Sequence, residues 1–485
     1  MARIEGRGIV AEFQEAPLPD ARLRDRLEKI AKSAQARPDS GFPQMFGTEA
    51  ELESFYRFVR NDRVDWESVV APHVQATVRR ASGYDAVVVA HDTCEFRFGG
   101  RSDRAGLTRG RSKKENSGPN ARQGFHCHMA LAVTPHEDRA PLGVLAMFPW
   151  ARTSETPTSK RSAGSDYAEV AHLPSEQDRW AQLVEDVEDR VGDATNAIHV
   201  MDSEADDYAL LANLTRGSSR FVIRMCYDRI IFDEQMQRLG SKTKQFVAQN
   251  QPVCTRRVKV SSRKSFSGVA TKRGSSRTER QATLSIKAAP VTFRRPANSK
   301  EKSAASVCAN VVLVQEVEPP EGVEPVEWML VTSESIDGQA GILQVVDYYR
   351  ARWRIEEFFK AIKSGCAYEK RQLESLDTLL VALAMFVPVA WQLLHMRTLC
   401  RADPALPADR CLSARQLVVL RLSSEKTLPD KPTVRDALLR IARLGGHLKR
   451  NGEPGWQTLG RGLLELMALE RGFLLASAAE RCDQS

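Results

Sequence analysis

The chain has 485 residues, of which 42% are hydrophobic and 27% are charged. This length is enough for two to four domains, and the composition excludes collagen-like, wholly disordered and disulfide-stapled proteins. The formal net charge is +8, from 70 Lys and Arg against 62 Asp and Glu. The nine cysteines are scattered without a CxxC pair, which favours a reducing compartment such as the cytosol.

The first segment in chain order is predicted to be helical. Asp20 suits the cap of a helix over 20–36, whose apolar residues keep helical spacing. Thr48 and Glu51 have the spacing of a capping box that opens a second helix. Lys and Arg cover the other faces of the first helix, so a basic helical module is expected over 1–75.

The next segment alternates between strands and helices. One buried strand run ends at Asp92, a hairpin of strands is expected over 125–135 and 141–149, and a strand over 197–201 ends at Asp202. An amphipathic helix lies between the hairpin and the last of these strands. This order of elements predicts a mixed α/β sheet.

Residues 228–325 break this pattern. They are basic and turn-rich with strand-like alternation, so an inserted β-rich subdomain is predicted. A strand over 328–332 returns to the main sheet, and one long helix is predicted over 338–363. The chain after Leu373 is predicted to be helical, and its apolar run over 378–391 reads as a core helix, too short to cross a bilayer.

Basic side chains are concentrated in two blocks. Residues 251–300 hold thirteen Lys and Arg against Glu279 alone, and residues 97–122 hold eight against Asp103 and Glu115. Two such blocks on a nearly balanced chain favour a polyanionic partner, with a solvated loop as the alternative. The sequence has no phosphate-binding P-loop motif, so no nucleotide cofactor is expected.

Asp92 and Asp202 are the first candidates for chemistry because each follows a predicted buried strand. Carboxylates at the ends of neighbouring strands meet at one edge of a sheet, and about three of them can hold two divalent ions roughly 3.5–4 Å apart. Hard oxygen ligands select Mg²⁺ or Mn²⁺. The alternative for each acid, considered alone, is a structural role in a turn or as a helix cap, without metal binding.

The segment that begins at Tyr349 has the most informative pattern. On a helical wheel, one stripe of polar residues lies beside an apolar stripe. The polar residues are Tyr349, Arg352, Glu356, Lys360 and Lys363. A carboxylate among cations and a phenol can serve a metal and phosphate groups. An ordinary salt-bridged helix surface, such as Glu356 with Lys360, is the alternative.

The spacing Tyr349-x2-Arg352-x3-Glu356-x6-Lys363 resembles the Y-R-E-K signature of the insertion-sequence-four group of bacterial DDE cut-and-paste transposases. The residues around it are most similar to the transposon-five branch of that group. Further matches occur in the same order along the chain, at 56–61, 92–93, 202–206, 220–224, 328–334 and 455–462.

The resemblance implies a fold with three domains. An RNase-H-like α/β catalytic core would span 76–372, with the β-rich subdomain over 228–325 inserted in it. An all-α N-terminal domain over 1–75 would bind DNA ends, and an all-α C-terminal domain over 373–485 would dimerise. An apolar stripe in the last domain would supply the dimer contact, and packing inside the chain is the alternative. The stripe consists of Trp456, Leu459, Leu463, Leu466 and Leu469.

The resemblance also implies roles for single residues. Asp92, Asp202 and Glu356 would be the catalytic DDE triad and the ligands of two Mg²⁺ or Mn²⁺ ions. The implied DNA-binding residues are Arg224, Trp328, Tyr349, Arg352, Lys360 and Lys363. Trp328 would stack on a base flipped out of the duplex.

The reaction that the resemblance implies is excision by 3′ nicking, hairpin formation and opening, and joining of the 3′-hydroxyl to target DNA. The implied partners are double-stranded DNA, comprising transposon-end inverted repeats and target DNA, and a second copy of the chain in a homodimeric synapse. No membrane partner is expected, and the implied location is the bacterial cytoplasm, at the nucleoid. The alternatives are a catalytically silent DNA-binding regulator and an RNase-H-like structure-specific nuclease.

Three further observations qualify this interpretation. Ser203 follows Asp202 where the transposon-five branch carries Arg, and the Gly- and Arg-rich 97–122 segment also differs from that branch. His126 and His128 share a strand face, but no second pair of ligands completes a zinc site.

Overall fold

The structure is a computed structural model that describes residues 12–36, 40–100, 103–109, 122–152, 178–260, 279–297, 304–423, 428–448 and 452–483. Parts of both basic blocks therefore lie outside the described residues. The chain divides into two compact units. Unit 1 comprises Met1–Arg179, Glu185–Asn196 and Trp353–Ser485, and unit 2 comprises Trp180–Val184 and Ala197–Arg352.

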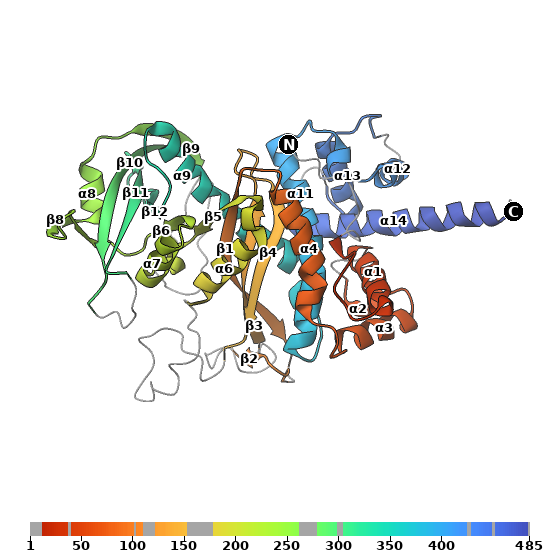
Figure 1. Ribbon diagram of the computed structural model, residues 1–485. Helices are drawn as coiled ribbons and strands as arrows, with labels where there is room; N and C mark the ends of the chain where they lie inside the picture. The colour runs from red at the N-terminus through yellow and green to blue at the C-terminus, as the bar shows by residue number, and fades with distance from the viewer. Residues whose placement is uncertain are drawn as a thin grey trace. The chain divides into compact units, whose positions relative to one another are not determined.

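The helices of unit 1 come from both ends of the chain (Figure 1). They are α1 (Ala21–Ala36), α2 (Phe42–Met45), α3 (Glu49–Val59), α4 (Trp66–Ala81), α10 (Trp353–Lys360), α11 (Leu376–Ala402), α12 (Ala414–Leu422), α13 (Val434–Leu444) and α14 (Trp456–Asp483).

The predicted helix caps near the N-terminus are confirmed. The Asp20 Oδ1 atom accepts the Leu23 N–H at 2.9 Å, and the Thr48 Oγ1 atom accepts the Glu51 N–H at 3.2 Å. The Glu51 carboxylate reaches back to the Gly47 N–H at 2.9 Å, one residue before the cap. Side chains thus satisfy N–H groups that have no partner inside the helix.

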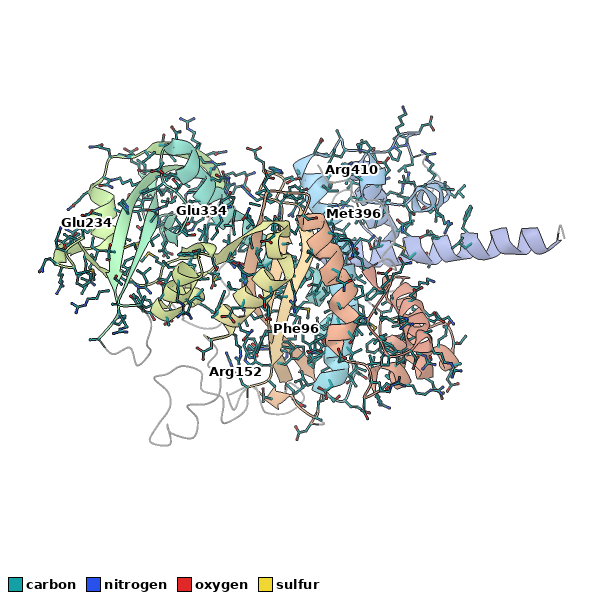
Figure 2. All side chains as sticks on the ribbon, in the orientation of Figure 1. Phe96, Arg152, Glu234, Glu334, Met396 and Arg410 are labelled. Carbon is teal, nitrogen blue, oxygen red and sulfur yellow. The ribbon has the colours of Figure 1, made fainter. Side chains whose placement is uncertain are left out.

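The strands of unit 1 form an antiparallel sheet around β3. They are β1 (Ala86–Gly99), β2 (Thr108–Arg109), β3 (Arg122–Val133) and β4 (Pro141–Trp150), and β3 pairs with each of the others. The predicted hairpin is confirmed as β3 and β4. The prediction that the strand ends at Asp92 is wrong, because β1 continues to Gly99 with Asp92 opposite Met129. Phe96, labelled in Figure 2, is fully buried beyond Asp92.

The central helix of unit 1 is α11, which contains the predicted core run. Its 27 residues are longer than that run, since Pro388 is accommodated inside the helix. By length and composition it is apolar enough to cross a membrane, but 94% of its most apolar window is buried inside the fold. The Trp391 Nε1–H donates to the Pro141 carbonyl at 2.9 Å and ties the helix to β4. This burial is that of a core helix.

The C-terminal helix α14 packs on its own chain along its first half. Leu459, Leu463 and Leu466 are at most 1% exposed, and the helix contacts α13. Packing inside the chain therefore accounts for these three members of the predicted dimer stripe. Phe473 and Leu474, further along the helix, are 38% and 39% exposed.

Unit 2 is built on one mixed sheet. Its strands are β5 (Asn196–Met201), β6 (Arg220–Arg224), β7 (Ile230–Phe232), β8 (Arg238–Lys242), β9 (Cys254–Val260), β10 (Arg280–Arg294), β11 (Ser306–Val317) and β12 (Glu327–Thr332). The order is β5-β6-β12-β11-β10-β7-β8, with β9 paired to β10. Figure 1 shows β10, β11 and β12 side by side. The strands within 228–325 thus continue the sheet of β6 and β12.

Helices cover the sheet of unit 2. They are α7 (Tyr208–Arg216), α8 (Thr243–Gln249) and α9 (Gln339–Ala351), together with part of α6 (Asp178–Val191). Leu211 of α7 packs into one core with Phe221, Ile223 and Leu313 of the strands. This core fixes the sheet edge at which β5 and β6 end.

The predicted single helix over 338–363 is wrong. Helix α9 ends at Ala351, Arg352 lies in a turn, α10 begins at Trp353, and a π-helical segment η5 (Ala361–Gly365) follows it. Tyr349 and Glu356 therefore lie on different helices. Arg352 keeps helical dihedral angles (φ −51°, ψ −34°), and its N–H bonds to the Tyr349 carbonyl, so the wheel of 100° per residue is disturbed only by this one tightened turn.

Candidate active site

One edge of the unit 2 sheet gathers residues that the sequence analysis singled out. Strands β5 and β6 are parallel with Met201 beside Ile223, and Arg224 pairs with Leu330 of antiparallel β12. Asp202 directly follows β5, Arg224 ends β6, and Trp328 lies two residues before Leu330 near the start of β12. These three residues therefore lie at the same end of the sheet, as the strand-end argument predicted for Asp202.

Tyr349 of α9 lies at the same edge. Its ring meets the Trp328 ring edge to face, with centroids 5.4 Å apart and an interplanar angle of 62°. Burial raises the pKa of Tyr349, while the nearby Arg352 and Arg224 cations act in the opposite direction and Asp202 acts with burial. The Tyr349 hydroxyl thus interacts electrostatically with Arg352, Arg224 and Asp202.

Asp202 also serves as a helix cap. Its Oδ1 atom accepts the Glu204 N–H at 2.9 Å at the start of the 3₁₀ segment η4 (Ser203–Ala205). The capping alternative considered from sequence is therefore realised. A half-buried carboxylate that bonds through one oxygen atom retains a second oxygen for other ligands.

Asp206 was not singled out from sequence, yet it anchors this edge. Its Oδ2 atom accepts the backbone N–H groups of Cys226 and Tyr227 at 2.7 and 2.9 Å. Its Oδ1 atom pairs with Arg229, whose Nη2 also donates to the Asp206 carbonyl at 3.1 Å. Asp206 is only 3% exposed, so this is a buried ion pair with further hydrogen bonds. It ties the segment after Asp202 to the turn after β6.

Unit 1 carries the other two predicted acids. Asp92 lies half-buried in β1, where its Oδ1 atom accepts the Thr93 N–H at 2.8 Å. Glu356 lies half-buried on α10, and α10 packs against β1 and β3. Asp92 and Glu356 thus come from two packed elements of unit 1, and Asp202 comes from unit 2.

The two predicted lysine contacts lie on α10 and η5. Lys360 is exposed, and its Nζ atom lies 4.9 Å from the centroid of the Trp353 ring. Lys363 Nζ donates to the Glu95 carbonyl at 2.6 Å and lies 3.5 Å from the Glu369 carboxylate. Lys363 is therefore held beside β1 by oxygen atoms of the protein itself.

Glu357, next to Glu356, has a different environment. It is 7% exposed, and its two carboxylate oxygens accept from Arg354 at 2.7 Å and Arg401 at 2.5 Å. Burial alone would raise the pKa of Glu357, but the two arginines outweigh it and lower the pKa. Glu357 is therefore an ionised structural residue, while Glu356 is the acid with partial access to solvent.

The histidines on β3 make contacts inside unit 1. The His126 ring stacks on Trp150 with centroids 5.3 Å apart, and His128 Nδ1 lies 2.8 Å from Thr93 Oγ1. Burial, aided by the Arg179 charge, lowers the pKa of His128 to about 3. Within the described ranges, no group of three or more His, Cys, Asp or Glu is arranged to hold a metal ion.

The donor chemistry of the predicted triad nevertheless suits a hard divalent cation. Asp92, Asp202 and Glu356 are carboxylates, and each is half-buried. Carboxylate oxygens are the ligands that Mg²⁺ and Mn²⁺ prefer in proteins.

Two protein families match parts of the chain. Residues 9–64 match the transposase DNA-binding family, and residues 171–387 match the transposase DDE domain family. The second match includes Asp202 and the whole segment from Tyr349 to Lys363, and it begins after Asp92. The matches indicate a transposase DNA-binding domain followed by a transposase DDE domain along the chain. A DDE domain implies an RNase-H-like core, and the mixed sheet of unit 2 agrees with it.

A solved structure was also found in comparison with known folds. It is the cryo-EM structure of a piggyBac transposase synaptic complex with hairpin DNA. The similarity has a TM-score of 0.32 at 10% sequence identity, and covers 92% of this chain and 71% of that chain.

Proposed function

We propose that the protein is an active cut-and-paste DNA transposase of the insertion-sequence-four group, closest to its transposon-five branch. The observation that carries the proposal is the gathering of Asp202, Arg224, Trp328, Tyr349 and Arg352 at one edge of the unit 2 sheet. An acid beside cations and a ring is the set of groups that phosphoryl transfer on DNA requires.

The three carboxylates would hold the metal ions. Asp92, Asp202 and Glu356 are the proposed ligands of two Mg²⁺ or Mn²⁺ ions, which when bound activate water or a 3′-hydroxyl and stabilise the leaving oxygen. The neighbouring cations Arg224 and Arg352 would bind the phosphates of the DNA strand and neutralise charge that develops on them.

The remaining predicted residues would position the DNA. Lys360 and Lys363 would bind phosphates from α10 and η5, and Tyr349 would do so from α9. Trp328 would stack on a flipped base during hairpin formation, because an aromatic face replaces the stacking that the base loses in the duplex.

The proposed reaction runs in four steps. Water cleaves the phosphodiester at the 3′ end of the element and leaves a 3′-hydroxyl on the element and a 5′-phosphate on the flanking DNA. That 3′-hydroxyl attacks the opposite strand and forms a hairpin as the 3′-oxygen of the flanking DNA leaves. A second water opens the hairpin and regenerates the 3′-hydroxyl, which joins to target DNA as a target 3′-oxygen leaves. Two inverted repeats would be paired by a homodimer, in the bacterial cytoplasm at the nucleoid. All four steps are phosphoryl transfers, so one site serves them.

End mapping tests the proposal. The protein is incubated with fragmented DNA from its source and Mg²⁺, and new DNA ends are sequenced. Glu356→Gln is run in parallel, with Glu465→Gln on the exposed face of α14 as the matched control. We expect sharp 3′ ends at one inverted repeat and joined products with wild type and the control, and neither with Glu356→Gln.

The same experiment separates the alternatives. DNA fragments that are bound but never cut by wild type would indicate the catalytically silent regulator. Cutting without joined products, and without pairing of two ends, would indicate a structure-specific nuclease.

A further inference from the structure

The turn that Asp206 anchors presents one exposed aromatic residue. Tyr227 is 63% exposed, although its backbone N–H is bonded to the buried Asp206 carboxylate at 2.9 Å. The next residue is also fixed, because the Asp228 Oδ1 atom accepts the Lys244 N–H at 2.9 Å. The backbone on both sides of the Tyr227 ring is therefore held in place while the ring faces solvent.

A cation accompanies this ring. The Arg229 guanidinium carbon lies 5.6 Å from the Tyr227 ring centroid, within the range of a cation–π contact. Arg229 is itself fixed by Asp206, so the cation cannot move away freely. A large aromatic surface that stays exposed on a fixed backbone beside a cation is suited to stacking on a nucleobase.

The position of Tyr227 relates it to the predicted site. Asp202 follows Met201, which pairs with Ile223, so Asp202 and Arg224 are level at the sheet edge. Tyr227 comes three residues after Arg224. Three extended residues span about 10 Å, and successive bases of one strand are about 3.4 Å apart along a duplex. The Tyr227 Cα atom thus lies within about three base spacings of the Arg224 Cα atom.

We propose that Tyr227 is a DNA-contacting residue whose ring stacks on a nucleobase within three nucleotides of the scissile phosphate. This inference rests on the proposed function and adds a second aromatic contact to that of Trp328. Asp206 acts as its positioning residue, since the Asp206 carboxylate fixes both the Tyr227 backbone and the Arg229 cation.

Photo-cross-linking tests the inference. The inverted repeat identified by end mapping is synthesised with 5-iodouracil at one position at a time, because this base cross-links to an aromatic ring stacked on it. We expect a cross-link to Tyr227 from one or two adjacent positions within three nucleotides of the cleavage site. Tyr227→Phe should keep the cross-link, and Tyr227→Leu should lose it.

Binding to the same DNA gives an independent measurement. We expect Tyr227→Leu to bind about tenfold more weakly, the scale of one lost base-stacking contact, and Tyr227→Phe to bind like wild type. Val253→Ala, at another exposed apolar position of unit 2, is the matched control and should bind like wild type. Because Tyr227 is exposed, we expect these variants to fold, and thermal unfolding of each variant checks this.

The outcomes separate this inference from the proposed function. If wild type binds and cuts the repeat while no base cross-links to Tyr227 and Tyr227→Leu binds normally, the stacking role is wrong and the transposase function stands. If Tyr227→Leu instead changes subunit association and leaves DNA binding intact, the ring belongs to a protein interface and the stacking role is also wrong. Failure of wild type to bind or cut any DNA overturns both proposals.

Discussion

The ring of Trp328 meets the ring of Tyr349 edge to face, with centroids 5.4 Å apart. The contact joins β12 to α9 at the edge where Asp202 and Arg224 lie. Tyr349 is 7% exposed, whereas Trp328 is half-buried, so the tyrosine supports the indole from the protein side. An aromatic group supported in this way can offer a face to DNA without first being ordered.

Replacing Trp328 by alanine should separate nicking from hairpin formation. The first nick needs only the acids and the phosphate contacts, whereas the hairpin needs a base held outside the duplex. We expect Trp328→Ala to nick the inverted repeat at a rate close to wild type and to form at least tenfold less hairpin. Denaturing gels of labelled repeat DNA measure both products. Trp328→Phe, which keeps an aromatic face, should restore part of the hairpin, and an equal loss of both products would contradict the stacking role.

The neighbours Glu356 and Glu357 should respond differently to the same substitution. Glu357→Gln removes the buried charge that pairs with Arg354 and with the 47% exposed Arg401 side chain, and we expect it to cost about 1–3 kcal/mol, the scale of a weakened buried hydrogen-bonding group. Glu356 is only half-buried, so Glu356→Gln should abolish cleavage and lower the free energy of unfolding less than Glu357→Gln does. Urea unfolding and cleavage assays on both variants check this, and a strongly destabilised Glu356→Gln would argue that Glu356 is structural as well.

Glu12 forms a buried network in unit 1. Its carboxylate lies 2.6 Å from His73 Nδ1 and 2.7 Å from Arg80 Nη1, and His73 Nε2 accepts the Val144 N–H at 3.1 Å. Burial alone would raise the pKa of Glu12, but the bonds from His73 and Arg80 outweigh it and lower the pKa from 4.5 to about 2. Burial lowers the pKa of His73, so its ring is neutral and donates from Nδ1 to Glu12.

Stability of the fold should therefore fall in acid. Glu12 binds protons more weakly in the folded chain, so its contribution of about 3 kcal/mol is present above pH 4.5 and is lost as the pH falls towards 2. Glu12→Gln should lower stability at pH 7 and flatten the loss between pH 6 and 3, measured by urea unfolding at each pH. Glu49→Gln, at an exposed position of α3, should leave the pH profile unchanged. A Glu12→Gln profile that parallels wild type would contradict this assignment.

Lys363→Ala should weaken binding to the inverted repeat and make it less sensitive to salt. One lost phosphate contact reduces the slope of log K against log salt by about one unit. Fluorescence anisotropy at several salt concentrations measures the slope. Lys431→Ala, at an exposed loop position of unit 1, is the control for removal of a positive charge. An unchanged slope for Lys363→Ala would mean that Glu95 and Glu369 keep this lysine from DNA.

Local signals in the sequence predicted part of the fold well. The caps at Asp20 and Thr48 and the strand that ends at Asp202 depend on neighbouring residues, so they could be read directly. The edge position of Asp202 followed from the same local reading. Asp92 pairs with Met129, which is far away in the sequence. When this pairing is not known, the polar residues after Asp92 are typical of a loop.

The missed elements of the site depend on such distant contacts. Asp206 was visible only as part of a motif, and its role comes from the amides of Cys226 and Tyr227 in another segment. The turn at Arg352 contains no Gly or Pro, so the helical periodicity on both sides predicted one continuous helix. Tyr227 had one usable signal, an aromatic residue among Arg and Asp directly after a short strand.

The boundary at Arg352 bears on the residue spacing of the Y-R-E-K signature. The interval from Tyr349 to Glu356 includes the boundary between α9 and α10 at Arg352. Within a single helix, one added residue turns everything after it by about 100°. Arg352 keeps helical dihedral angles, so an insertion beside it would change the interval from Tyr349 to Glu356 in the same way. The signature should therefore constrain the number of residues between Tyr349 and Glu356 as well as their identities. We expect substitutions of Trp353 to be tolerated better than the insertion of one alanine beside it.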